Sequence, residues 1–151
     1  MKRLALLLSS CLGIGYVKGG GTLVSILTCA VWYYAGRGHD AVTLMPALLT
    51  ALILVVGIWS AGEMEVKWGK DSYRVVIDEV AGMCLSLLFI PVKWPYILIG
   101  LILFRFFDMI KPLYIRRLED LRGGWGVMMD DMLAGLYANL ILQALVFLKL
   151  W

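Results

Sequence analysis

Five acidic residues lie at or near the ends of apolar segments in this sequence. They form the pairs Asp78-Glu79 and Asp130-Asp131 and the single position Asp108. A carboxylate inside a bilayer costs about 2.5–3.5 kcal/mol even on a lenient insertion scale, so five of them in such a chain indicate a function. Carboxylate oxygens favour Mg2+, Mn2+ or Ca2+. We therefore predict a divalent-cation site, with the two pairs as the metal ligands.

Two basic residues flank Asp108 at helical spacing. Arg105, Asp108 and Lys111 follow one another at intervals of three, which places them on one face of a helix. Five carboxylates against these two cations leave a net charge of −3 in one neighbourhood. Because Mg2+ often binds both protein carboxylates and substrate phosphate, and because Arg grips phosphate with two hydrogen bonds, the pattern indicates a metal–phosphate site. Arg105 and Lys111 are the predicted phosphate ligands.

The residues that the chain lacks narrow the mechanism. No cysteine is followed by an arginine six residues later, which argues against the cysteine phosphatases. The single histidine, His39, falls in a loop on the opposite side, which argues against a histidine nucleophile and against zinc or iron. Two mechanisms remain open: water activated by Mg2+ and a carboxylate, which we favour, and direct attack by an aspartate.

A run of glycines, Gly19-Gly20-Gly21 followed by Thr22, opens the first long apolar segment. Bare backbone N–H groups at a helix N-terminus can receive a phosphate. The run lacks the Gly-Lys-Ser/Thr ending of a nucleotide-binding loop. A flexible entry loop with Thr22 as the helix N-cap is an equally good interpretation.

The segments that must position these residues are apolar helices. Hydrophobic residues make up 62% of the 151 positions, and the mean hydropathy is +0.85, far outside the usual soluble range. No apolar run alternates with period two, so helices are expected rather than strands. Only two of the runs approach the roughly 20 residues that span a bilayer. The runs cover residues 22–35, 42–60, 80–90, 94–107 and 132–150.

Two prolines suggest how the middle of the chain is arranged. Pro91 and Pro95, with Lys93 between them, suit a turn at the membrane interface, so residues 78–108 are expected to form a helical hairpin. One long kinked span is the alternative, and it would separate Asp78 from Asp108. The hairpin places 11 of the 14 basic residues and ten of the 11 acidic residues on one side. Basic loops stay cytoplasmic, so the chemistry is expected there.

Residues 75–82 and 127–135 are similar to each other. Each has a carboxylate pair at the head of an apolar helix, followed by Ala81-Gly82 or Ala134-Gly135. Small residues let helices approach closely, so the two pairs could face one another. We predict an all-α fold, a polytopic membrane helical bundle forming one domain over residues 1–151. It would have a short N-terminal helix and about four to five membrane helices, including the hairpin.

Three blocks together resemble the phosphatidylglycerophosphatase A family. They are VIDEVAG at residues 76–82, FRFFDMIKP at 104–112 and GGWGVMMDDMLAG at 123–135, with Lys70-Asp71 before the first. The resemblance runs over essentially the whole chain. It implies an all-helical enzyme of the bacterial inner membrane, with its active site on the cytoplasmic side. Such an enzyme uses Mg2+ to hydrolyse phosphatidylglycerophosphate to phosphatidylglycerol and phosphate.

The N-terminal block departs from the family pattern, because Gly20 stands where a proline usually precedes Gly21 and Thr22. A cation carrier and a phosphatidyl transferase are the alternative functions. The partners expected are a phospholipid and the membrane, and not nucleic acid, since the net charge is only +3 and basic residues do not cluster with aromatic ones. The motif match also assigns expected roles to individual residues. The predicted catalytic residues are Asp78, Glu79, Asp108, Asp130 and Asp131. The predicted substrate-binding residues are Arg105, Lys111, Gly21, Thr22 and Lys70.

Overall fold

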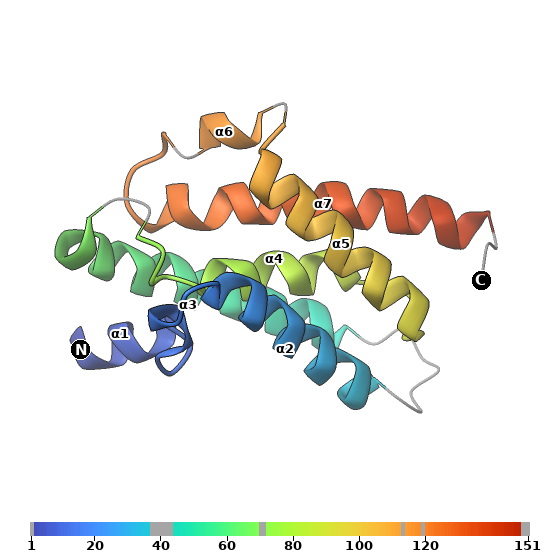
Figure 1. Cartoon of the computed structure of the whole chain (residues 1–151), viewed down its shortest axis with the longest axis horizontal. Coiled ribbons are helices and arrows are strands. Elements are labelled where there is room, and N and C mark those ends of the chain that lie inside the picture. Colours follow the sequence, from blue (N-terminus) through green and yellow to red (C-terminus); the bar gives the residue numbers. More distant parts are fainter. Residues whose placement is uncertain (1, 37–43, 70–71, 113, 119, 149–151) are drawn as a thin grey trace.

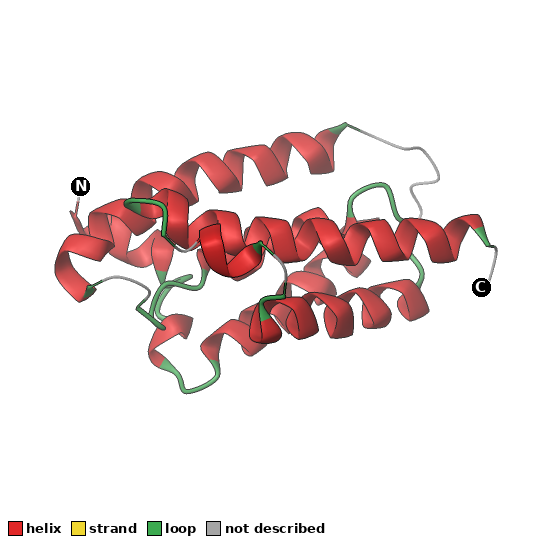
Figure 2. Ribbon diagram, turned by 90° about the horizontal axis from the view of Figure 1, so that it is seen from above, coloured by secondary structure: helices red, strands yellow, loops and turns green. Residues whose placement is uncertain are grey.

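The computed structural model describes residues 2–36, 44–69, 72–112, 114–118 and 120–148. All regular elements in those ranges are helical, which confirms the predicted all-α class (Figures 1 and 2). The elements are α1 (Lys2–Ser9), the 3-10 helix η1 (Ile14–Tyr16), α2 (Gly20–Gly36), α3 (Met45–Trp68), α4 (Ile77–Leu87), α5 (Trp94–Ile110), α6 (Ile115–Leu118) and α7 (Gly124–Phe147).

The longer helices run back and forth along one axis of the molecule. In Figure 1, α2, α4 and α7 run from left to right, and α3 and α5 return. We call the left end, where α4 and α7 begin, the acidic end, and the right end, with the turn at residues 88–93, the turn end. The short elements α1 and η1 lie at the acidic end, where α1 packs on α3. Every carboxylate of the predicted site is therefore on helices that begin or end there.

The predicted hairpin is confirmed, and the alternative of one long kinked span is wrong. Helix α4 ends at Leu87, Phe89 adopts the left-handed region with φ 60°, and α5 begins at Trp94. Pro95 falls in the first turn of α5, where its missing N–H costs no intrahelical hydrogen bond. The chain therefore reverses at residues 88–93, and the antiparallel helices return Asp108 to the level of Asp78.

The close approach predicted for the two similar segments is also confirmed. A Cβ atom on Gly135 would overlap the Gly82 carbonyl, and one on Gly82 would lie 2.6 Å from the Asp131 carbonyl oxygen. Helices α4 and α7 therefore cross almost backbone to backbone just beyond the two acidic pairs. This contact lets Asp78 and Asp131, on different helices, share one small space.

Side-chain amides of α7 satisfy the end of α4. The Asn139 amide donates to the carbonyls of Ser86 and Leu88 at 3.0 and 2.9 Å, and Gln143 donates to Leu88 at 3.4 Å. The last carbonyls of a helix have no intrahelical partner, and in an apolar environment no water replaces it. These two residues thus make a short, early-ending α4 tolerable.

Among the described residues, two helices, α3 and α7, are long and apolar enough to cross a membrane. Only 22% of the most apolar stretch of α3 is buried, which is unlike the core helix of a soluble protein. Leu48, Leu52 and Val55 on its outer face are 58–65% exposed. Membrane association suits this surface, whereas a crossing by the shorter helices α2, α4 and α5 stays a prediction.

Candidate functional site

A small cavity of about 140 Å³ lies at the acidic end between α4, α5 and α7. We call it the acidic cavity. All five predicted carboxylates line it, although they come from three separate blocks of sequence. Its lining residues are Ser72, Tyr73, Val75, Asp78, Glu79, Asp108, Lys111, Val127, Asp130 and Asp131.

Three of these carboxylates are placed to hold a cation. Oxygen atoms of Asp78, Glu79 and Asp131 all lie within 4.8 Å of one another. Oε2 of Glu79 is buried and accepts no hydrogen bond from any residue that the structure describes. A divalent cation would satisfy that oxygen, and an all-oxygen donor set suits Mg2+. The geometry of this triad thus fits the predicted metal.

The remaining two carboxylates are paired with the predicted phosphate ligands. Arg105 Nη1 lies 2.6 Å from Asp108 Oδ2 and 3.9 Å from Glu79 Oε1. Lys111 Nζ donates to Asp130 Oδ2 at 2.7 Å, and the other Asp130 oxygen accepts from the Asp131 backbone N–H at 2.9 Å. Asp130, which we predicted as a metal ligand, therefore lies outside the triad and faces Lys111. Lys111 lines the acidic cavity, whereas Arg105 does not and is next to the triad through its 3.9 Å approach to Glu79.

The first turn of α2 lies next to the acidic cavity because Gly21 has no side chain. A Cβ atom on Gly21 would overlap Glu79 Oε1, so the carboxylate can take this position only because residue 21 is glycine. Thr22 is exposed and does not line the acidic cavity. The structure therefore brings Gly21, but not the Thr22 side chain, to the site. Lys70 lies outside the described residues.

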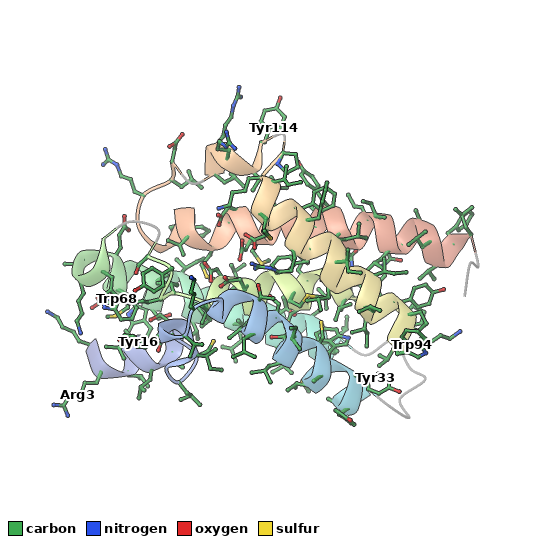
Figure 3. The ribbon with its side chains drawn as sticks, in the orientation of Figure 1. Arg3, Tyr16, Tyr33, Trp68, Trp94 and Tyr114 are labelled. Carbon is green, nitrogen blue, oxygen red and sulfur yellow. The ribbon has the colours of Figure 1, made fainter. Side chains whose placement is uncertain are left out.

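Sequence reasoning missed the loop before α4. Ser72 and Tyr73 line the acidic cavity, and the next residue, Arg74, lies over three aromatic rings. Its guanidinium carbon is 5.4–5.9 Å from the ring centres of Tyr16, Trp68 and Tyr73, and Figure 3 shows Tyr16 and Trp68 side by side at the acidic end. Contacts of this kind are attractive and fix the loop that leads into Asp78. The short spacing of Ser72 and Tyr73 from Asp78 was the available signal.

Family comparison agrees with these motifs. The phosphatidylglycerophosphatase A family model matches residues 7–146. A "putative phosphatidylinositol-3-phosphatase" of Bacteroides thetaiotaomicron is 38% identical over 141 residues, covering 87% of this chain and 89% of the relative. Phosphatidylglycerophosphatase A of Escherichia coli K12 is 31% identical over 146 residues, covering 87% and 79%.

A third relative matches over a shorter length. Phosphatidylglycerophosphatase A of Haemophilus influenzae is 36% identical over 103 residues, covering 66% of this chain and 63% of the relative. No solved structure matches. The family model spans most of the chain and includes every carboxylate of the acidic cavity. The chain therefore belongs to the phosphatidylglycerophosphatase A family of lipid phosphatases.

Proposed function

We propose that this protein uses Mg2+ to hydrolyse the terminal phosphate of phosphatidylglycerophosphate, giving phosphatidylglycerol and inorganic phosphate. The observation that carries the proposal is the placement of two cations directly beside a carboxylate triad. Arg105 and Lys111 flank Asp78, Glu79 and Asp131, so a metal and a phosphate group can be held together. The family assignment supports neither the cation carrier nor the phosphatidyl transferase.

In this proposal the carboxylate triad binds the metal, and the two cations bind the phosphate. Asp78, Glu79 and Asp131 would hold Mg2+, which when bound draws charge from the phosphoryl oxygens and acidifies a water molecule. Arg105 and Lys111 would bind the remaining phosphate oxygens. Each would at the same time keep its ion pair, Arg105 with Asp108 and Lys111 with Asp130. Such preorganised charges stabilise the transition state without reorganising.

The reaction exchanges one bond to phosphorus for another. The water oxygen forms a bond to phosphorus, the bond between phosphorus and the glycerol oxygen breaks, and that oxygen takes a proton to become the free alcohol. Asp130 lines the same cavity and would accept a proton from the attacking water, and that proton can then pass to the leaving glycerol oxygen. Lys111 keeps Asp130 in the ionised form that can act as the base. Attack by an aspartate in place of water stays an alternative.

A second substrate is favoured by one specific observation. The Bacteroides relative at 38% identity is named for phosphatidylinositol 3-phosphate rather than phosphatidylglycerophosphate. Both lipids present a phosphate monoester on a polyol headgroup, so the same triad and cations would serve either. The wall formed by Ser72 and Tyr73 is where a headgroup would be distinguished.

The proposed location is the inner membrane of a bacterium, with the acidic cavity on the cytoplasmic side. Helices α3 and α7 support membrane insertion. Arg3 lies in α1, Lys67 in the last turn of α3 and Arg116 in α6, and these parts of the chain lie on the side of the molecule where α7 begins (Figure 1). Basic segments of this kind stay on the cytoplasmic side, so the proposal matches their position.

Phosphate release from defined lipids tests the proposal. Purified protein in detergent receives phosphatidylglycerophosphate, phosphatidylinositol 3-phosphate or phosphatidic acid, with and without Mg2+. Preferred hydrolysis of the first, only with Mg2+, is the expected result. Asp131→Asn should abolish turnover, whereas Asp120→Asn, at an exposed position outside the cavity, should not. Full turnover by Asp131→Asn, or turnover without any divalent cation, would contradict the proposal.

A further inference from the structure

A second, much larger cavity adjoins the acidic end and has an apolar lining. It is a groove of about 1170 Å³ between α2 and α3, with α4 as its floor. Val24, Thr28 and Val31 represent the α2 wall, and Leu49 and Ile53 represent the α3 wall. We call it the apolar groove. No residue of the groove is part of the acidic cavity.

The two threonine hydroxyls of the groove already have hydrogen-bond partners. The Thr28 hydroxyl donates to the Val24 carbonyl at 2.9 Å, and the Thr50 hydroxyl donates to the Pro46 carbonyl at 2.8 Å. Both threonine hydroxyls are therefore occupied by hydrogen bonds to their own helix. Because most of the other lining residues are aliphatic or aromatic, the groove suits a hydrocarbon rather than a polar ligand.

The groove begins one residue away from the acidic cavity. Glu79 lines the acidic cavity, whereas the next residue, Val80, lines the groove. Gly21 touches Glu79, and Val24, one turn further along α2, lines the groove. The two cavities are therefore neighbours along α4 and α2, with the contact between Gly21 and Glu79 where they meet, so one lipid with its charged head in the first could place its apolar tail in the second.

The length of the groove matches one leaflet of a bilayer. The lining runs along α2 from Val24 to Gly36, which at 1.5 Å per residue is about 18 Å. Half of a roughly 30 Å hydrocarbon core is about 15 Å. Figure 3 shows Tyr33, near the far mouth, at the opposite end of the molecule from Tyr16. The groove can therefore take one extended acyl chain.

We propose that the apolar groove binds an acyl chain of the lipid whose phosphate enters the acidic cavity. The proposal rests on the proposed function, because it takes the same lipid as the occupant. Lipid tails are as apolar as the groove, so binding gains little from leaving the bilayer. The groove acts instead by orienting the phosphate toward the triad, and its loss should lower kcat/KM by about tenfold.

A matched pair of substitutions on α2 tests this role. Ala35 lines the far part of the groove, whereas Ala30 does not, and both side chains are exposed. Ala35→Trp should reduce kcat/KM for a dipalmitoyl substrate while leaving a dihexanoyl substrate unaffected, and Ala30→Trp should change neither. Equal effects of the two variants, or no effect of Ala35→Trp on the dipalmitoyl substrate, would overturn the proposal.

A binding measurement separates this proposal from the proposed function. A phosphatidic acid and a phosphatidylcholine carrying the same photoreactive acyl chain are irradiated with the wild-type protein. Stronger labelling of groove residues by phosphatidic acid supports the proposal even if the catalytic assay shows another substrate. Equal labelling by both lipids, or labelling only outside the groove, refutes it, because the groove would then hold bulk lipid or none.

Discussion

Gly21→Ala probes the contact between α2 and the acidic cavity. The added methyl group would occupy the space of Glu79 Oε1, at the movable end of a side chain rather than against backbone. We expect the carboxylate to give way while the helices keep their places. The substitution therefore separates the position of one metal-site oxygen from the fold.

Gly21→Ala should have a small effect on the free energy of unfolding and a large effect on turnover. Inside a helix, alanine is favoured over glycine by about 0.8–1.0 kcal/mol, which offsets part of the cost of moving the largely buried Glu79 carboxylate. Stability should therefore change by less than about 1 kcal/mol. A catalytic group displaced by on the order of 1 Å can cost about 100-fold in rate. We accordingly expect kcat to fall by about that factor.

The assay measures phosphate release and thermal unfolding in the same detergent. Leu23→Ala is the control, because Leu23 is exposed on the same turn of α2 and lines neither cavity. Loss of activity with an unchanged Tm is the expected result for Gly21→Ala. If Gly21→Ala kept wild-type turnover, the contact with Glu79 would not matter for catalysis. If Gly21→Ala lowered the Tm as well as the activity, the contact would be a packing feature of the fold.

Three other variants test different parts of the structure. Asn139→Leu should lower the free energy of unfolding by about 1–3 kcal/mol, because the Ser86 carbonyl loses its side-chain donor and the Leu88 carbonyl keeps only Gln143; chemical denaturation checks this. Lys111→Met should raise KM for the lipid phosphate in steady-state assays. Combining it with Asp130→Asn should give a coupling free energy of about 0.5–3 kcal/mol in unfolding experiments, and strictly additive effects would mean that the ion pair contributes nothing to stability.

The helices were largely predictable from hydrophobic runs, but the start of α7 was not. The run at residues 132–150 led us to expect Asp130 and Asp131 at the head of this helix, whereas α7 begins at Gly124 and places both within it. Glycine and aspartate are poor helix formers, so the segment looked like a loop. Tertiary packing overrides that preference, since a Cβ atom on Gly124 would overlap the Ile58 carbonyl of α3.

The members of the site were easier to predict than their contacts. Charged residues in an apolar chain stand out individually, and the hairpin alone places Asp78 and Asp108 at one end. Which carboxylate faces which cation depends on side-chain geometry between helices distant in sequence. The contact of Gly21 with Glu79 is of this kind, and no local pattern encodes it.

The ion pairs of the site determine where its negative charge is left uncompensated. Arg105 is paired mainly with Asp108, and Lys111 is paired with Asp130, so the negative charge of the site is concentrated on Asp78, Glu79 and Asp131. If all five carboxylates are ionised, a phosphate dianion entering without a metal would meet net repulsion. Mg2+ at the triad removes most of that charge and gives the phosphate a third cationic partner. Metal and phosphate are therefore expected to bind this cavity together, and each should favour the other by the same factor.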